Sequence, residues 1–205
     1  MYNEYKKNVF CRLCMSKNIS QVFSIGRSPL GNALYKSLKE KSKPKYPLAL
    51  ILCENCGHLQ LSHKVNPREL FQDSYTYLSG TSKVFVDYLE SYVVSITNEF
   101  NLGQNSKILE IGSNDGTCLS FFKKKTCKVI GVDPAELPAK IANKKGINTI
   151  VDFFSSASVD NIIQKFGHFD LVTSHNALAH VDDLIDVFKA IKKVLRPKGM
   201  LIFEI

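Results

Sequence analysis

Two kinds of apolar pattern alternate along the second half of the chain. Short continuous apolar runs predict buried strands at 107–111, 128–132, 149–151, 169–173 and 200–205. Between these runs, apolar residues recur at helical spacing and predict helices at about 116–124, between 133 and 145, at about 157–166 and at about 183–195. Apolar strands that alternate with helices are typical of a parallel sheet covered on both faces, so we expect an α/β fold.

A further helix is predicted ahead of this region, at residues 83–99. Its apolar stripe consists of Phe85, Tyr88, Leu89, Tyr92, Val93 and Ile96. Such a stripe packs against a core, and Thr81 or Ser82 is placed to cap the first turn. A shorter helix is predicted at Pro67–Phe71, with proline in its first turn.

The first part of the chain has a β pattern instead. The apolar segment 46–52 predicts a strand, and Leu59–Leu61 predicts its hairpin partner. Proline and glycine in the segment 25–34 predict a loop.

These patterns divide the chain into three parts. We expect a small domain at residues 1–62, a linker with a helix at 63–100, and an α/β domain at 101–205. The last strand, Leu201–Ile205, is apolar and ends with the chain, which would leave an apolar strand at the sheet edge. We therefore expect the N-terminal portion of a longer protein, with a sheet that is cut after its fifth strand.

Composition narrows the cellular setting. The segment Met1–Lys7 lacks the apolar core of a signal peptide, and no apolar run approaches membrane-spanning length. We therefore expect a cytoplasmic protein with reduced cysteines and no membrane partner. The formal charge of +8 comes mostly from interspersed Lys, without an Arg-rich patch that contains aromatic residues. This favours a solvated basic surface over a nucleic-acid-binding surface.

Four of the six cysteines form two Cys-x-x-Cys pairs, Cys11 with Cys14 and Cys53 with Cys56. Each pair brings two thiolates together at a tight turn, and two pairs match the four ligands of a closed tetrahedral zinc site. In a reducing compartment, paired cysteines indicate a metal before a disulfide. We therefore predict a structural zinc site in the small domain. His58 follows the second pair, but the four cysteines already complete the ligand set.

The segment Ile108–Thr117 combines a buried strand, a glycine turn and a helix start. The residues of interest along it are Glu110, Gly112, Ser113, Asn114 and Gly116. A dinucleotide fingerprint requires Gly-x-Gly-x-x-Gly for close approach to a pyrophosphate, and this loop lacks its second glycine. The acidic Glu110 and Asp115 suit a cationic ligand better than a phosphate. S-adenosylmethionine (SAM) carries a sulfonium, an ammonium group and ribose hydroxyls, so this loop predicts a SAM site, with Gly112 and Gly116 permitting close approach of the backbone.

Polar residues also follow the next strands, whose carboxyl ends meet at one edge of a parallel sheet. Asp133, followed by Pro134, lies about 20 residues beyond the glycine loop, the spacing at which an acidic residue accepts ribose hydroxyls. Asp152 can accept from the adenine amino group and Phe153 can pack on the ring, although this pair could equally cap the next helix. Asn176 is placed to contact the methionine end of the cofactor.

Candidate catalytic groups lie near the same edge. His175 and His180 are possible general bases, but an isolated histidine is more often structural. The segment Tyr75–Ser82 is dense in hydroxyl groups. Its spacing fits a helix-capping loop and a hydroxyl-rich active-site wall equally well.

Short motifs spread over the chain form a specific combination, although each motif alone is common. They are the two Cys-x-x-Cys pairs, Pro29–Ala33, Tyr46–Leu48, Cys53–Gln60, Tyr75–Ser79, Leu109–Gly116, Gly131–Ala135 and Asn176–His180. Together they resemble the zinc-containing, SAM-dependent sugar C-methyltransferases, which act on nucleotide-linked keto-deoxysugars. The resemblance covers essentially the whole chain.

This resemblance implies a zinc-binding domain, a Rossmann-like SAM methyltransferase domain and a further C-terminal domain. In that family a base removes a proton next to the sugar ketone, and the enolate carbon then takes the methyl group. The family's Tyr-x-Tyr segment contributes a tyrosine to the sugar site, for which Tyr77 is the favoured match and Tyr75 the second. We take both tyrosines and His180 as catalytic candidates. The family's Glu–His pair would fall after Ile205.

The leading expectation is therefore C-methylation of a nucleotide-sugar, with SAM and zinc as cofactors and no nucleic-acid partner. A zinc-containing SAM-dependent RNA methyltransferase would suit the basic charge, but the interspersed Lys and the tyrosine-rich segment argue against it. A SAM-binding protein without turnover would suit a chain whose sheet is cut at Ile205. The sequence does not fix the sugar or the oligomeric state.

Overall fold

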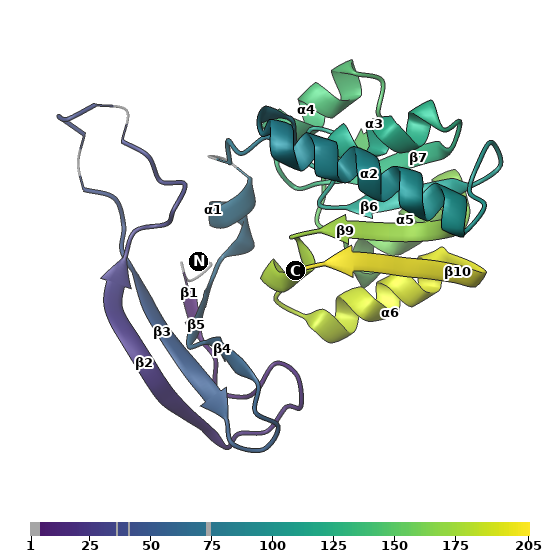
Figure 1. The fold of residues 1–205 in the computed structure, drawn as a ribbon. Coiled ribbons are helices and arrows are strands. Elements are labelled where there is room, and N and C mark those ends of the chain that lie inside the picture. The colour runs from purple at the N-terminus through teal and green to yellow at the C-terminus, as the bar shows by residue number, and fades with distance from the viewer. Residues whose placement is uncertain (1–4, 36, 41, 73–74) are drawn as a thin grey trace. The chain divides into compact units, whose positions relative to one another are not determined.

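The protein is described by a computed structural model that covers residues 5–35, 37–40, 42–72 and 75–205. The chain divides into two compact units, Met1–Tyr75 and Thr76–Ile205. Each unit has its own β-structure (Figure 1), and each is described by itself.

The first unit is built from two small antiparallel sheets. One contains β2 (Ile19–Ser28), β3 (Tyr46–Cys53) and β4 (Leu59–Leu61), with β3 in the centre. The other pairs β1 (Tyr5–Lys7) with β5 (His63–Val65), and α1 (Pro67–Phe71) follows. The predicted strand at 46–52, its hairpin partner and the short helix are confirmed.

The loop predicted at 25–34 is wrong over its first residues, because β2 continues to Ser28 and pairs with the start of β3. The register shifts between Ser24 and Gly26, and Gly26 has φ of 84°. The glycine therefore marks an irregularity inside the strand instead of ending it.

The second unit contains a five-stranded parallel sheet in the order β10-β9-β6-β7-β8. Its strands are β6 (Lys107–Ile111), β7 (Lys128–Val132), β8 (Thr149–Ile150), β9 (Phe169–His175) and β10 (Leu195–Glu204). The chain runs outward from β6 to β8 and then returns to β9 on the other side of β6. The strand order thus reverses beside β6, and ligands of open α/β sheets bind at the carboxyl side of such a point. The predicted Rossmann-like α/β fold is confirmed.

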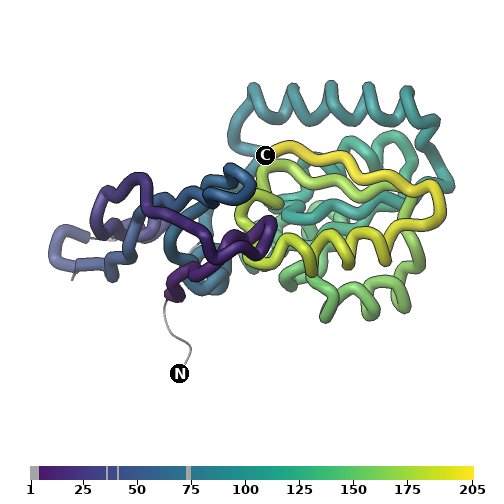
Figure 2. The backbone as a smooth tube through the Cα atoms, turned by 90° about the horizontal axis from the view of Figure 1, so that it is seen from below, coloured from purple at the N-terminus to yellow at the C-terminus, as the bar shows by residue number. Residues whose placement is uncertain are grey.

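Helices cover both faces of this sheet. They are α2 (Lys83–Glu99), α3 (Thr117–Lys124), α4 (Glu136–Lys144), α5 (Ser156–Phe166) and α6 (Leu184–Val194). Figure 2 shows α2 along one face of the strands and α6 along the other. Short 3-10 helices occupy Ser79–Thr81 and Leu178–His180. The helix predicted at 83–99 is confirmed, and the Ser82 hydroxyl caps it by accepting from the Phe85 N–H at 3.4 Å.

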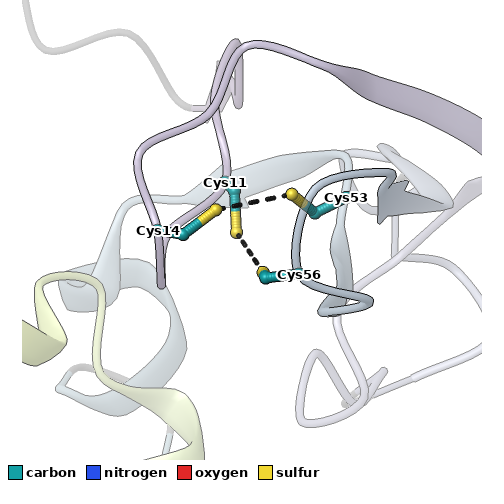
Figure 3. A group of neighbouring side chains, drawn as sticks. All are labelled: Cys11, Cys14, Cys53 and Cys56. Carbon is teal, nitrogen blue, oxygen red and sulfur yellow. Dashed lines mark hydrogen bonds between the residues drawn. The ribbon is translucent and has the colours of Figure 1, made fainter.

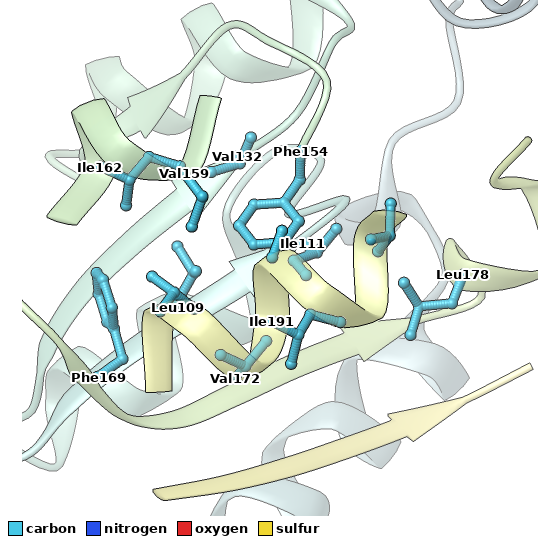
Figure 4. Packing of buried hydrophobic residues seen from close by; sticks show 13 residues of the cluster. Leu109, Ile111, Val132, Phe154, Val159, Ile162, Phe169, Val172, Leu178 and Ile191 are labelled. Atoms are coloured by element: carbon cyan, nitrogen blue, oxygen red, sulfur yellow. The ribbon is translucent and has the colours of Figure 1, made fainter. Parts of the chain in front are cut away.

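Alternate residues of the strands supply two hydrophobic clusters, one on each face. Toward α2 and α3 the cluster includes Leu89, Ile108, Leu119, Phe122 and Leu171. Toward α5 and α6 it includes Leu109, Val159, Ile162, Val172 and Ile191 (Figure 4). Because both faces are buried, the central strands are apolar throughout.

Two details differ from the sequence expectation. β10 begins at Leu195, earlier than the strand predicted at 200–205, and residues 196–199 form an irregular part of it, where the register shifts between Leu195 and Met200. Tyr88, predicted as part of the core stripe of α2, is 44% exposed, and its hydroxyl donates to the Glu204 carboxylate. A tyrosine with a reachable acceptor at the protein surface keeps its polar end there.

None of the helices in the described ranges combines the length and the apolar character needed to cross a bilayer.

The packing of α2 gives a first prediction. Leu89 is 2% exposed within the cluster on its face of the sheet, so Leu89→Ala should lower the free energy of unfolding by about 2–5 kcal/mol. Urea unfolding followed by circular dichroism measures this change. The matched control is Leu137→Ala on α4, where the leucine is 51% exposed and the change should be well below that of Leu89→Ala. Equal losses for both variants would contradict the packing described for α2.

Candidate functional site

The four paired cysteines converge on one point in the first unit (Figure 3). The Sγ atoms of Cys14 and Cys53 are 3.5 Å apart, and those of Cys11 and Cys56 are 3.7 Å apart. All four sulfurs lie within 4.8 Å of one another. Four sulfurs at this spacing fit a closed tetrahedral zinc site, which is structural because it leaves no position for a substrate.

Each cysteine pair sits in a tight turn that aims its sulfurs inward. The N–H of Met15 bonds to the Cys11 carbonyl, and the N–H of Gly57 bonds to the Cys53 carbonyl, both at 2.9 Å. Met15 and Gly57 both have positive φ, so each turn closes at the position after its second cysteine. The two turns therefore have the same local geometry, as expected of two halves of one metal site.

Further hydrogen bonds hold the first turn to its surroundings and reach the cysteine sulfurs. The Gln60 side chain accepts from the Arg12 N–H at 2.7 Å and donates to the Phe10 carbonyl at 3.1 Å, which ties the first turn to β4. The Leu13 N–H points at the Cys11 sulfur (3.4 Å), and the Asn55 amide points at the Cys14 sulfur (3.6 Å). N–H groups aimed at sulfur stabilise thiolates, as outer groups around metal ligands do.

The thiols also influence each other's ionisation. A backbone hydrogen bond from Ser16 is the main factor that lowers the pKa of Cys14 to about 6. At Cys56 the backbone N–H of His58 favours the thiolate, but the neighbouring Cys14 sulfur and burial outweigh it and raise the pKa to about 12. Four thiolates together need a cation to balance their charge, and Zn²⁺ provides it. His58, whose side chain is not part of the four-sulfur cluster, is not needed as a ligand.

In the second unit the glycine loop follows β6 and leads into α3. Gly112 and Gly116 have φ of 72° and 75°, where glycine is favoured. A Cβ on Gly112 would lie 2.5 Å from the Cβ of Ala177, and a Cβ on Gly116 would lie 3.0 Å from that of Ala142. Gly112 therefore allows the loop to pack closely against the segment after β9, and Gly116 allows it to pack closely against α4. Ser113 between them is 3% exposed, and its hydroxyl oxygen has no hydrogen-bond partner among the described residues.

Asp133 at the end of β7 is joined to the glycine loop. Its carboxylate accepts from the backbone N–H groups of Asn114 and Ala135, both at 2.8 Å. Burial raises the pKa of Asp133, whereas the two N–H bonds lower it. Each carboxylate oxygen accepts one bond from the chain and has a second lone pair, so the pair of oxygens can still accept from two ligand hydroxyls. This fits the ribose of SAM.

Asn114 explains why the loop lacks the second glycine of a dinucleotide fingerprint. Its φ of 50° lies in the left-handed region, which asparagine tolerates better than most residues. Its amide donates to the Tyr77 carbonyl at 3.0 Å and accepts from the Ser79 N–H at 2.9 Å. A glycine would provide the backbone turn but not these two bonds. Asn114 therefore holds the segment 77–79 against the cofactor loop.

Asp115 adds a second tie. Its carboxylate accepts from the Gly80 N–H at 3.3 Å and from the Thr117 hydroxyl at 2.7 Å, and Lys145 approaches it at 3.2 Å. A Cβ on Gly80 would lie 2.7 Å from the Asp115 carboxylate, so only glycine fits there without a shift. The Asp115 carboxylate is thus engaged by groups of the chain itself, whereas its charge in the sequence suggested that it would bind a cationic ligand.

Glu110, at the end of β6, is 3% exposed and bonds through Oε1 to Nδ1 of His175 at 3.1 Å. Burial raises the pKa of Glu110, and the bond to His175 and the charge of His175 lower it. His175 therefore lies against a predicted cofactor residue, a contact that the sequence does not reveal because the two are 65 positions apart.

Three further predicted residues follow β7 and β8. Pro134 is half-buried beside Asp133. Asp152 is exposed and accepts from the N–H of Phe153 at 2.8 Å, and Phe153 is half-buried. The structure thus places an acidic and an aromatic side chain side by side after β8.

Asn176 follows β9 with φ of 55° and is bound to the end of β10. Its side-chain amide donates to Glu204 Oε1 at 3.0 Å, and its backbone N–H donates to the Glu204 carbonyl at 3.1 Å. The hydrogen bond from Tyr88 to the same carboxylate is the largest factor that raises the pKa of Tyr88 to about 12. Glu204 and Tyr88 are members of this edge that the sequence reasoning missed, since their contact spans 116 positions.

The three catalytic candidates are distributed over both units. Tyr77 belongs to the second unit and is 47% exposed, with its backbone held by Asn114. His180 is an exposed residue of the 3-10 helix after β9. Tyr75 ends the first unit, where its ring packs edge-on against Phe71 at 5.9 Å between ring centres. Within the second unit, the structure therefore holds the backbone of Tyr77 at the glycine loop.

Comparison with known families agrees with this geometry. Residues 85–205 match the family described as a methyltransferase domain, and residues 11–71 match a zinc-binding domain family. Since the first match extends over more than half of the chain, the chain belongs to the methyltransferase domain family. It carries a SAM-dependent methyltransferase domain behind an N-terminal zinc-binding domain with a four-cysteine site.

Individual relatives are more distant. The C-methyltransferase NovU of Streptomyces niveus is 29% identical over 196 residues, which are 95% of this chain and 46% of NovU. A ubiquinone biosynthesis O-methyltransferase of Vibrio campbellii is 25% identical over 100 residues, or 48% of this chain and 43% of that enzyme. The crystal structure of the plantazolicin methyltransferase BpumL in complex with a triazolic desmethylPZN analog and SAH has 20% identity and a TM-score of 0.49, with 61% of this chain and 48% of that chain covered. The chain spans less than half the length of both curated relatives.

The four-sulfur site gives a second prediction. Metal analysis of the purified protein should yield one zinc per chain, and Cys53→Ser should abolish it, because three remaining sulfurs leave the tetrahedral set incomplete. Cys127→Ser is the matched control, because Cys127 is a buried cysteine outside the cluster and its loss should leave the zinc content unchanged. A wild-type protein without zinc, or full zinc in Cys53→Ser, would contradict the site.

Proposed function

We propose that this chain takes part in SAM-dependent C-methylation of a nucleotide-linked keto-deoxysugar through an enolate. The observation that carries the proposal is the pair of Asn114 bonds that hold the Tyr77–Ser79 segment to the cofactor loop. The likeness to the C-methyltransferase NovU supports it, since that likeness extends over 95% of the chain, including the zinc-binding part. The chain spans less than half of NovU, and C-methylation is therefore proposed here and does not follow from the likeness alone.

The residues at the carboxyl edge fit the different parts of SAM. Asp133 would accept the two ribose hydroxyls with the lone pairs that its bonds to Asn114 and Ala135 leave available. The glycine loop runs from Gly112 through Ser113 to Gly116. Its own backbone would approach the ligand closely, because glycine has no side chain to keep the ligand away. Bound SAM supplies an electrophilic methyl group at this edge.

The two ends of the ligand would meet different side chains. Asp152 and Phe153 would contact adenine, the carboxylate accepting from the amino group and the ring packing on the base. Pro134 would line the turn beside the ribose. Glu110 and Asn176 would contact the methionine end, where an ammonium group needs a carboxylate and a carboxylate needs a donor.

The chain's own residues would handle the proton of the acceptor. A carbon next to a ketone becomes nucleophilic when a base takes its proton and the electron pair moves onto the carbonyl oxygen. Tyr77 and His180 are the candidates for base and for donor to the enolate oxygen, with Tyr75 as a further hydroxyl. The enolate carbon then forms a bond to the methyl group as the methyl–sulfur bond breaks.

The ribose assignment gives a third prediction. Asp133→Ala should weaken SAM binding by at least about tenfold, because it removes both hydroxyl acceptors and the anchor of the Asn114 N–H. Isothermal titration calorimetry measures the affinity. Asp160→Ala is the control, because Asp160 is an exposed aspartate on α5 that pairs with Lys193 and should leave the affinity unchanged. An unchanged affinity in Asp133→Ala would refute the assignment.

The proposed chemistry gives a fourth prediction. With SAM and a nucleotide-linked keto-deoxysugar, the product should carry a new carbon–methyl bond, visible by mass spectrometry and NMR. Tyr77→Phe should lower the turnover number by roughly 10²-fold at unchanged SAM affinity, because it removes a proton-transfer group but no cofactor contact. Tyr35→Phe, an exposed tyrosine of the first unit, is the control and should keep full turnover.

Exchange of the acceptor proton separates turnover from binding. In D₂O with S-adenosylhomocysteine in place of SAM, the proposed base should incorporate deuterium next to the ketone. SAM binding without exchange or methyl transfer would contradict the sugar chemistry and would leave a SAM-binding protein without turnover.

A further inference from the structure

The buried Glu110–His175 pair is not accounted for by the fold alone. Glu110 is the second-last residue of the central strand β6 and His175 is the last residue of the neighbouring β9, with 3.1 Å between Oε1 and Nδ1. The side chains of His175 and Glu110 are 6% and 4% exposed. A carboxylate and an imidazole taken out of water cost more free energy than an apolar pair of the same volume, so packing does not explain their presence.

The imidazole is held in place from the other side. The Tyr92 ring of α2 meets the His175 ring edge-to-face, with 4.7 Å between ring centres and 87° between planes. The Tyr92 hydroxyl is itself fixed by a hydrogen bond to the Thr173 hydroxyl at 2.7 Å. His175 therefore cannot turn away from Glu110 without a shift of α2 or of the β9 end.

Only half of the Glu110 carboxylate is used by this contact. Its Oε2 is buried and has no hydrogen-bond partner among the residues that the structure describes. A buried carboxylate oxygen without a donor is costly, which indicates that a donor arrives from outside the chain. The Cys118 sulfur lies within 4.8 Å of the pair, and a hydrogen bond from its thiol lowers the pKa of Glu110, but a thiol is only a weak donor. Burial raises the pKa of the Cys118 thiol well above the usual range, so it stays neutral and brings no competing anion.

We propose that His175 is a positioning residue of the cofactor site, which holds one oxygen of Glu110 so that the other receives the α-ammonium group of SAM. The inference rests on the proposed placement of the cofactor at this strand edge. Two features of the pair fit the role. The bond to His175 fixes the Glu110 rotamer, and both the bond and the charge of His175 oppose the burial that raises the pKa of Glu110. A carboxylate held in one orientation is what a directional bond from an ammonium ligand requires.

The experiment compares two ligands, only one of which carries the ammonium group. SAM carries it, whereas 5′-methylthioadenosine keeps the adenosine and the sulfur but lacks the whole amino-acid part. His175→Leu should weaken SAM binding by about tenfold or more, because it frees Glu110 to rotate and to become protonated, and should leave the affinity for 5′-methylthioadenosine unchanged. His175→Asn keeps an N–H donor near the position of Nδ1 and should restore part of the SAM affinity.

Controls make the outcomes distinct. His168→Leu changes the exposed histidine just before the other end of β9 and should alter neither affinity. Asp133→Ala should weaken both ligands, because both carry the ribose; if it weakens neither, the proposed cofactor placement fails and not the role of His175. Equal loss of both ligands in His175→Leu, or no loss of either, overturns the positioning role. Circular dichroism checks the fold of each variant, and if His175→Leu does not fold, SAM-selective weakening in His175→Asn supports the role and its absence overturns it.

Discussion

The hydrogen bond from the Asn114 N–H to the Asp133 carboxylate, 2.8 Å long, joins the two strand ends on which the cofactor site depends. Parallel pairing already brings the ends of β6 and β7 to one edge, but it does not fix the loop between β6 and α3. In that loop, three alternate residues have positive φ, namely Gly112, Asn114 and Gly116. The Asp133 carboxylate, which follows β7, holds the middle one of these residues, so a hydrogen bond within the chain fixes the shape of the loop.

Asn114 then extends this order beyond the loop. Its side chain uses both a donor and an acceptor on the segment 77–79, while Asp115 holds Gly80. A hydroxyl-rich segment next to a methyl donor is useful only if its position is reproducible, because proton transfer requires hydrogen-bond distances. Asn114, which stands where a dinucleotide fingerprint has its second glycine, and the neighbouring Asp115 thus tie the segment 77–80 to the glycine loop.

The sequence was informative where a pattern is local. The buried strands, the α2 boundaries with the Ser82 cap, the four cysteines and the spacing from the glycine loop to Asp133 follow from periodicity and short motifs. It was not informative where two partners are distant in the chain, or where a glycine is compatible with both a loop and an irregular strand. Gly26 lies inside β2 although glycine and proline nearby predicted a loop, and no local rule pairs Tyr88 with Glu204 or Glu110 with His175. These pairs exist because adjacent strands end at one edge beneath α2.

The two units solve the problem of stability differently. The second unit buries two hydrophobic clusters, one on each face of its sheet. In the described part of the first unit, by contrast, no such cluster forms, and β2 exposes Val22, Phe23 and Ile25 by half or more of their surface. A unit of this size with so few buried apolar side chains gains too little from burial to offset the entropy of ordering its chain. Cys11 and Cys53 are among its most buried residues, so the metal site lies where a core would be, and zinc binding supplies folding free energy that apolar packing does not.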